Sequence, residues 1–150
     1  MLSRQTSLGL VALGLVWWYK MNRVFKYFKY SEFADKRSGA NKMRPATIRR
    51  LDRAREIAGV PFIINSGYRD ENHPESIKNP TSSHIKGYAV DIAVNDSNRD
   101  IIQNALREAG FTRIGLGSTF IHADDDPEKT QYVTWFYNGR PTLYNQIQVV

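Results

Sequence analysis

The chain has 150 residues, 41% of them hydrophobic, which suits one globular domain with a modest core and argues against a second domain. Cysteine is absent, which excludes disulfide frameworks and thiol nucleophiles and leaves the redox compartment open. The net charge of +6 is uneven, because residues 1–50 carry eleven Lys and Arg against two acidic residues, whereas residues 51–150 carry ten against thirteen.

Residues 1–29 are predicted to lie apart from the folded domain, which we place at residues 30–150. Residues 8–19 are almost wholly apolar, but they are fewer than the roughly 20 needed to span a bilayer. Without a convincing cleavage site, they are typical of an uncleaved signal-anchor or an interfacial helix, with a disordered leader before Met21 as the alternative. Basic and aromatic residues alternate in the rest of the segment, which favours contact with an anionic membrane surface or wall polymer. No nucleic-acid-binding motif accompanies them, so nucleic acid is not predicted as a partner.

The first helix of the domain is predicted over residues 45–58. Its apolar residues lie towards one side, Pro45 occupies the first position, and Gly59 follows the end. Such a helix is expected to pack against the sheet.

An apolar run at residues 60–64 leads into the sequence SGYR, which ends at Arg69. Arg69 is therefore predicted to lie where a buried strand exits into a loop. There its guanidinium can bind a substrate carboxylate or stabilise the oxyanion that forms when water adds to an amide carbonyl. The alternative is a surface ion pair with Asp70 or Glu71.

Residues 70–83 are predicted to be a long polar loop that forms one wall of a cleft. His73 lies in this loop beside Pro74, and its polar setting predicts an exposed side chain that takes no part in metal binding. Ser83 ends the loop. Its hydroxyl either contacts substrate or merely terminates the loop.

The next segment begins at His84 with the pattern His-x-x-Gly-x-Ala-x-Asp. Strand alternation places Asp91 between two alanines on one face, with apolar residues on the other. A helix is predicted to follow over residues 98–109, where an apolar stripe recurs at helical spacing and Asp96 or Ser97 can cap the start.

Two further strands complete the predicted sheet. In residues 120–124, His122 and Asp124 share a face, so Asp124 lies beside His122. Residues 131–137 lead to a turn at residues 138–139 whose Asn-Gly sequence favours a hairpin. The element order predicts an α+β fold with a small antiparallel sheet and flanking helices.

His84, Asp91 and His122 together provide the nitrogen and oxygen donors that zinc prefers, and three protein ligands leave the fourth position of a catalytic site for water. Any one of them alone would more often be a loop histidine, a strand-end carboxylate or a satisfied core histidine. Their combination, in a chain with three histidines, predicts one bound Zn²⁺ and a hydrolase.

With these motifs in place, residues 30–137 resemble the M15-like peptidases: the zinc D-Ala-D-Ala carboxypeptidases and the related peptidoglycan endopeptidases of bacteria and phage endolysins. The matching pieces are Ser31-Glu32-Phe33, Ser66-Gly67-Tyr68-Arg69, the block from Ser83 to Asp91, Gly115-Leu116-Gly117, and Phe120-Ile121-His122-Ala123-Asp124.

The resemblance implies a hedgehog/D-Ala-D-Ala-peptidase-like fold, zinc bound by His84, Asp91 and His122, and Arg69 engaging the substrate near the scissile bond. It also implies peptidoglycan peptides as substrates. The expected location is the cell envelope or, for a phage-encoded enzyme, the host wall.

One departure from that family occurs at Thr119, where many relatives place a glutamate or aspartate as general base. Threonine cannot take up a proton at neutral pH, so Asp124 is the candidate for proton transfer. The alternative is that Asp124 accepts a hydrogen bond from a ligand histidine and fixes its tautomer. Because the fold family includes hedgehog domains that act by recognition, the alternative function is a metal-bearing peptidoglycan-binding or other recognition module without turnover.

Overall fold

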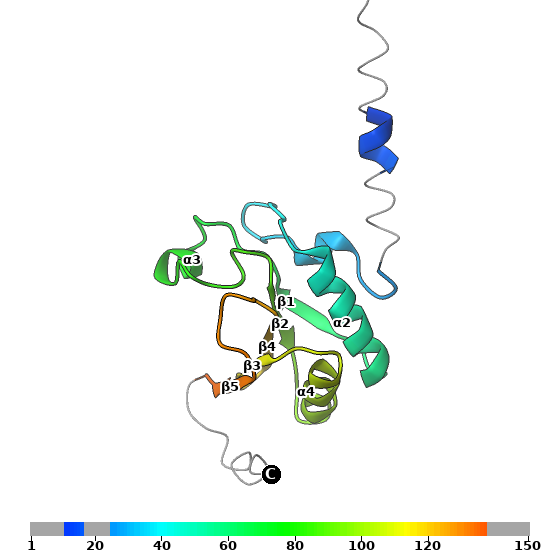
Figure 1. Ribbon diagram of the computed structural model, residues 1–150, viewed down its shortest axis with the longest axis vertical. Coiled ribbons are helices and arrows are strands. Elements are labelled where there is room, and N and C mark those ends of the chain that lie inside the picture. The colour runs from blue at the N-terminus through cyan, green and yellow to red at the C-terminus, as the bar shows by residue number, and fades with distance from the viewer. Residues whose placement is uncertain (1–10, 17–24, 138–150) are drawn as a thin grey trace, which may run out of the picture.

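The computed structural model describes residues 11–16 and 25–137, in which helical elements come first, helices and strands mix in the middle, and three strands come last (Figure 1). After a helical segment at residues 11–16, the elements in chain order are η1 (Tyr30–Phe33), α2 (Pro45–Ala58), β1 (Ile63–Ser66), α3 (Pro74–Lys78), β2 (Ala89–Ala93), α4 (Arg99–Glu108), β3 (Arg113–Leu116), β4 (Phe120–Asp124) and β5 (Val133–Phe136). The predicted α+β fold is confirmed.

Within the described residues, the strands form one sheet in the order β1-β2-β4-β3-β5. The pairs β1–β2, β2–β4 and β4–β3 are antiparallel, but β3 and β5 are parallel. The chain reverses after β4, and because β3 already occupies the edge of β4, β5 pairs with the far side of β3 in the same direction. The antiparallel prediction thus fails at this one pairing. The hairpin predicted at residues 138–139 lies outside the described residues.

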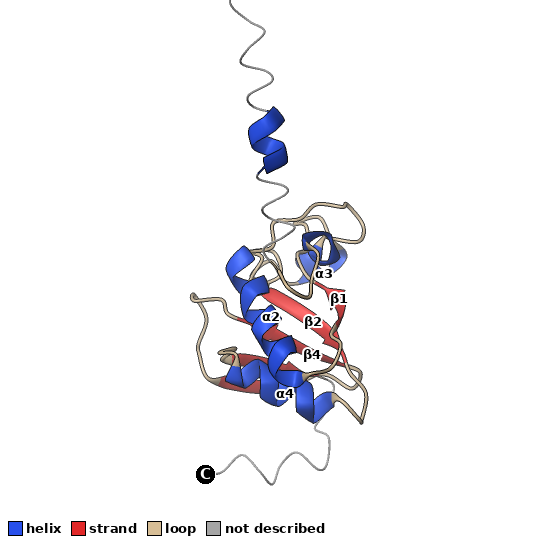
Figure 2. Ribbon diagram, turned by 90° about the vertical axis from the view of Figure 1, so that its right-hand side faces the viewer, coloured by secondary structure: helices blue, strands red, loops and turns tan. Residues whose placement is uncertain are grey.

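One face of the sheet forms the hydrophobic core with α2 and α4, which lie across the strands in Figure 2. The strand residues on this face are buried, and they are Val90, Ile92, Ile114, Leu116, Ile121 and Ala123. Ile48 and Leu51 of α2 and Ile102 and Leu106 of α4 belong to the same cluster. The predicted alternation in β2 and β4 is correct, so the opposite face is left for the polar residues.

The ends of the two long helices follow from local sequence to different degrees. Helix α2 has the predicted bounds, with Pro45 in its first turn and Gly59 in the left-handed conformation at its end. Helix α4 is not capped by Asp96 or Ser97 as predicted, since Asn98 is its N-cap residue and makes no side-chain capping bond. Instead the side chain of Asn95 accepts the backbone N–H groups of Ser97 and Asn98, which forms a turn ahead of the helix.

The folded domain extends upstream of the predicted start at residue 30. Phe25 and Phe28 are 6% and 3% exposed, and Phe28 packs edge-on against Phe33 at a ring distance of 5.4 Å. The backbone N–H groups of Lys26 and Tyr27 donate to the carboxylate of Asp52 in α2. Two of the aromatic residues that were predicted to face a membrane or polymer, Phe25 and Phe28, therefore belong to the core instead.

Half of the apolar stretch predicted at residues 8–19 lies outside the described residues, which include its 11–16 part. No helix in residues 11–16 or 25–137 combines the length and apolar character that a membrane crossing requires.

The loop predicted at residues 70–83 contains a short helix, α3, that the sequence reading missed. Pro74 opens it, and the Nδ1 atom of His73 accepts the backbone N–H of Glu75 at 3.1 Å. A five-residue helix is too short to show an apolar period, so composition alone indicated a loop. His73 is half-buried rather than exposed, and it lies outside the group of candidate metal ligands.

Asp35 is a buried carboxylate that fastens the SGYR segment to the start of the domain. It is 3% exposed, and its two oxygens accept the backbone N–H groups of Arg37 at 2.8 Å and Asp70 at 2.7 Å. Burial raises the pKa of Asp35, but the hydrogen bonds from the backbone N–H groups of Asp70, Arg37 and Ser38 outweigh it and leave the pKa below its ordinary value.

Replacing Asp35 with Asn should therefore lower the free energy of unfolding by about 1–3 kcal/mol near pH 7. Since the folded-state pKa lies below the unfolded one, the carboxylate stabilises the fold above about pH 4, and this contribution is lost as the pH falls through the folded value. Urea unfolding near pH 7 and near pH 3.5 measures the difference. The exposed Asp96→Asn variant should match wild type at both pH values, and a pH-independent deficit for Asp35→Asn would contradict the ionic explanation.

Candidate metal centre

The face of the sheet opposite α2 and α4 carries a row of functional side chains. In the strand register, Ser66 is opposite Asp91, Asp91 is opposite His122, His122 is opposite Gly115, and Gly115 is opposite Trp135. Directly opposed residues project to the same face of a sheet, so the row runs from β1 to β5 across one surface. Asp91 and His122 occupy the central strands, β2 and β4, where neighbours on both sides hold the backbone.

His84, in the turn before β2, completes a compact group with Asp91 and His122. His84 Nε2 lies 3.3 Å from His122 Nδ1 and 3.3 Å from Asp91 Oδ1, and Asp91 Oδ1 lies 3.0 Å from His122 Nδ1. Two ligand atoms bound tetrahedrally to zinc at about 2.0–2.1 Å are about 3.3 Å apart. These three buried donors therefore fit the ligand spacing of a zinc ion.

Each histidine is held by its other ring nitrogen. His84 Nδ1 donates to the carbonyl oxygen of Gly67 at 2.6 Å, and His122 Nε2 donates to Asp124 Oδ2 at 2.9 Å. These bonds fix the tautomers, because the remaining nitrogens, His84 Nε2 and His122 Nδ1, must then be the ones without a proton when a metal binds. A side chain at position 67 would come within 2.7 Å of the Phe33 carbonyl oxygen, so only glycine lets the backbone pack this closely against Phe33. In this position the carbonyl oxygen of Gly67 itself contacts His84.

Arg69 holds the third ligand. Its Nη2 lies 2.6 Å from Asp91 Oδ2, and its Nε donates to Ser66 Oγ at 2.9 Å. The ion pair that Arg69 makes is thus with Asp91 rather than with Asp70 or Glu71, and it leaves Asp91 Oδ1 for the metal. Arg69 also lines the cleft over the centre, so a contact with substrate remains open to it.

The protonation states of the group suit a cation. Burial raises the pKa of Asp91, but His84 and His122 lower it much further, so the carboxylate is ionised at neutral pH. Burial lowers the pKa of His84, which favours the neutral imidazole that a metal requires. Burial also lowers the pKa of His122, but the carboxylates of Asp124 and Asp91 reverse the shift and raise it overall. Metal binding is therefore expected to release a proton from His122.

A family model described as Peptidase M15 matches residues 26–124, a span that includes all three donors together with Arg69 and Ser83. The chain belongs to the M15 peptidase family. M15 peptidases use zinc, in agreement with the donor set and spacing of this centre. A search of curated proteins found no match to the chain.

A cleft of about 540 Å³ lies over the candidate metal centre of this M15 peptidase. One side is lined by Glu75 and Asn79, which belong to α3 or follow it, so the segment predicted to form a cleft wall does so. The other side is lined by Phe120, Lys129, Trp135 and Tyr137. A side chain at Gly115 would come within 2.6 Å of the Tyr137 ring and 2.7 Å of the Trp135 ring, so this glycine makes room for the aromatic wall.

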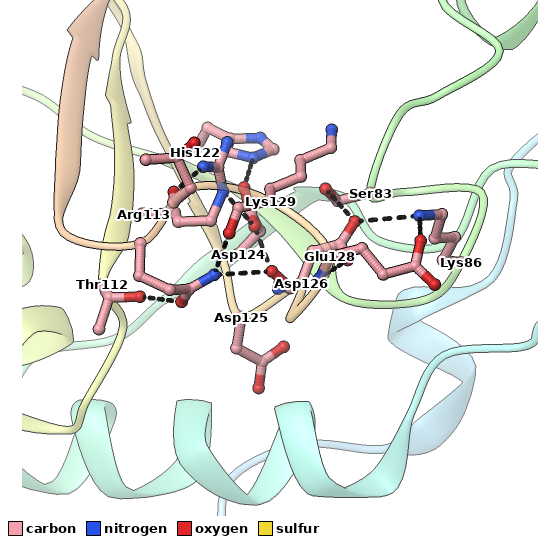
Figure 3. Close-up of polar contacts among 12 residues, drawn as sticks. Ser83, Lys86, Thr112, Arg113, His122, Asp124, Asp125, Asp126, Glu128 and Lys129 are labelled. Carbon is pink, nitrogen blue, oxygen red and sulfur yellow. Dashed lines mark hydrogen bonds and ion pairs between the residues drawn. The ribbon is translucent and has the colours of Figure 1, made fainter.

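Ser83 lines the cleft, whereas Thr119, the position at which the family pattern departs, is not among its lining residues. Ser83 is 2% exposed, and its hydroxyl donates to Asp126 Oδ2 at 3.0 Å, which anchors the turn that carries His84 (Figure 3). Thr119 is exposed in the connection between β3 and β4, where its carbonyl oxygen accepts the Val94 N–H.

Asp124 is 1% exposed, and both of its oxygens are engaged (Figure 3). Oδ2 accepts from His122, and Oδ1 accepts from Arg113 Nε at 2.8 Å and from the backbone N–H of Asp126 at 3.2 Å. Of the two roles predicted for this residue, these contacts favour the orientation of His122 over proton transfer.

Sequence reasoning missed several residues of the cleft. Glu75 lies within the predicted wall, but nothing in a polar loop indicates which carboxylate faces inward. Lys129, Trp135 and Tyr137 follow the last recognised motif, and they also lie beyond the family match at residues 26–124. The one sequence feature that could have indicated these cleft residues was the aromatic content of residues 131–137, which were predicted to form a strand.

The glycine of the His-x-x-Gly motif provides a further prediction. Gly87 has φ +74°, and a Cβ there would lie 2.2 Å from the carbonyl oxygen of Lys42. Gly87→Ala should destabilise the domain by about 2–4 kcal/mol and weaken zinc binding by displacing His84. Gly39 has the same φ but open space around it, so Gly39→Ala isolates the backbone strain and should cost about 1 kcal/mol. Urea unfolding measures the stability of both variants, and zinc titration measures their zinc affinity. Equal losses of stability in Gly87→Ala and Gly39→Ala would refute the steric contribution.

Proposed function

We propose that this M15 peptidase hydrolyses peptide bonds of bacterial peptidoglycan in a zinc-dependent reaction, as a carboxypeptidase or an endopeptidase. The observation that carries the proposal is the set of three donor atoms, 3.0–3.3 Å apart, at the base of a cleft about 540 Å³ in volume. A cleft of this size accommodates a short peptide. A zinc ion bound there supplies Lewis acidity towards the scissile carbonyl and lowers the pKa of a water molecule.

Arg69 is proposed to orient the substrate. Asp91 and Ser66 hold two of its guanidinium nitrogens, which fixes the plane of the group at the cleft wall and leaves Nη1 for a substrate oxygen. A guanidinium whose conformation is already fixed loses little entropy on binding, which suits it to stabilise negative charge as it develops on the carbonyl oxygen.

Proton transfer requires a carboxylate that the centre itself leaves free. Among residues 11–16 and 25–137, the carboxylates that line the cleft are Asp91, a candidate ligand, Asp124, which holds His122, and Glu75. We therefore propose Asp124 as a positioning residue and Glu75 as the proton acceptor. The hydrogen bond from Lys78 lowers the pKa of Glu75, so it is ionised and able to accept a proton at neutral pH.

The proposal places the protein at the cell envelope or, if it is phage-encoded, at the host wall. We also propose that the part of residues 1–29 that precedes the core residue Phe25 contacts a membrane or an anionic wall polymer. Co-sedimentation tests this contact. The full chain and a chain that lacks residues 1–20 are each spun down with anionic vesicles and, separately, with purified wall polymer. Equal partition of the two chains would refute the contact.

Mass spectrometry of purified peptidoglycan after incubation with the full chain tests the activity. New fragments that disappear with a chelator and return with added zinc are expected, and their masses identify the bond that is cut. Walls of several peptide compositions should be compared, because the bond depends on the cleft wall. Retention of the protein on the wall without new fragments would instead support a recognition module without turnover.

A further inference from the structure

The charge of Lys129 stands out among the cations of the cleft. Of the described residues that line it, three carry a Lys or Arg side chain. Arg69 is paired with Asp91 at 2.6 Å and Arg113 with Asp124 at 2.8 Å. The Lys129 ammonium makes no hydrogen bond or ion pair with residues 11–16 or 25–137, and no dashed line reaches it in Figure 3.

The backbone of Lys129 is nevertheless firmly held. Its N–H donates to the carbonyl of Asp126, and its own carbonyl accepts Nε2 of Gln131 at 2.6 Å. Gln131 is fixed in turn by the hydroxyl of Thr112 at 2.6 Å, and Asp126 is fully buried. A pinned turn thus presents a flexible side chain with a free positive charge to the cleft, on the side where Figure 3 shows His122 and Ser83.

An ammonium in this position suits an anionic group of the ligand. Lys129 as a residue is half-buried at the cleft wall, where a charge is screened less than on an open surface. The carboxylates of Asp91 and Asp124 are already paired with Arg69 and with His122 and Arg113, so they do not neutralise the charge of Lys129. On a peptide substrate the available anion is a carboxylate.

We propose that Lys129 binds a carboxylate of the peptide substrate next to the scissile bond. This inference rests on the proposed peptidase function and deepens it, because the carboxylate has two possible sources. It is either the free C-terminus of the leaving residue, as in a carboxypeptidase, or a side-chain carboxylate of the wall peptide, as in an endopeptidase.

The test compares wild type, Lys129→Met, Lys129→Arg and the control Lys42→Met on two matched pairs of peptides. One pair ends in D-Ala-D-Ala as the free acid or the amide, and the other is a cross-linked wall peptide with its side-chain carboxylates free or amidated. Lys42 is exposed and outside the cleft, so its variant should match wild type. We expect Lys129→Met to raise KM about 10- to 100-fold for the acid form of one pair, with kcat little changed. The acid form of that pair should then no longer have a lower KM than the amide form.

Lys129→Arg should retain most of the preference. The pair that responds identifies the source of the carboxylate, and an unchanged acid-to-amide ratio in both pairs would overturn the inference. Binding of the same peptides to zinc-free protein, followed by NMR, provides a readout independent of turnover. If wild type cleaves no peptide, the proposed function fails, whereas a loss of acid-selective binding in Lys129→Met would still support the carboxylate contact.

Discussion

Replacing His122 with Ala should abolish stoichiometric zinc binding and reduce peptide hydrolysis by more than about 1,000-fold. His122 supplies one of three donor atoms and lies in the middle of the sheet, where the backbone cannot move to bring in a substitute. The variant also leaves Asp91 and Asp124 without the ring that lies between them. Metal content after dialysis and the initial rate of hydrolysis measure the two effects.

The third histidine of the chain provides the matched control. His73 lies outside the metal group, and among the described residues its ring makes one hydrogen bond, which it accepts from the Glu75 N–H at the start of α3. His73→Ala should retain one zinc ion and most of the activity. Full zinc occupancy in His122→Ala, or an equal loss in both variants, would contradict the assigned ligand set.

Replacing Asp124 with Asn should weaken zinc binding by about 10- to 100-fold. The amide keeps the size of the side chain but removes the charge that polarises His122 and pairs with Arg113. If Asp124 only positions the histidine, kcat should recover largely at saturating zinc. Zinc affinity from competition with a chelator, together with kcat as a function of zinc concentration, separates occupancy from chemistry.

Glu75→Gln is the complementary variant. It should retain wild-type zinc affinity, because Glu75 touches none of the three donors, yet kcat should fall by about 100- to 10,000-fold at saturating zinc. The reverse result, with a persistent kcat defect in Asp124→Asn and normal turnover in Glu75→Gln, would restore Asp124 as the proton acceptor.

The candidate metal donors could be found from sequence because each one stands in a local pattern. Asp91 and His122 each lie on a short strand whose alternation assigns the face, and His84 is tied to Asp91 by a motif of eight residues. Gly87 of that motif marks a close backbone approach, which the structure places against Lys42. The pairing of β2 with β4 then follows from the need to bury one face of each strand.

The cleft walls could not be predicted in the same way, because they depend on contacts between segments distant in sequence. Helix α3 is too short to have a period, so Glu75 could not be placed. The parallel pairing of β5 with β3 depends on which sheet edge is free after β4 has paired, and no residue of β5 encodes it. The contacts of Arg69 with Asp91 and of Asp124 with Arg113 likewise required the assembled sheet.

The position of β5 at the border of the sheet means that the two parts of the site are held with different rigidity. The donors on β2 and β4 are clamped by strands on both sides, whereas β5 is hydrogen-bonded along only one side among the described strands. A shift of two residues along β3 would exchange the aromatic ring opposite Gly115 and leave Asp91 and His122 in place. The wall of the cleft can therefore be reshaped through an outer strand without disturbing the geometry of the candidate metal ligands.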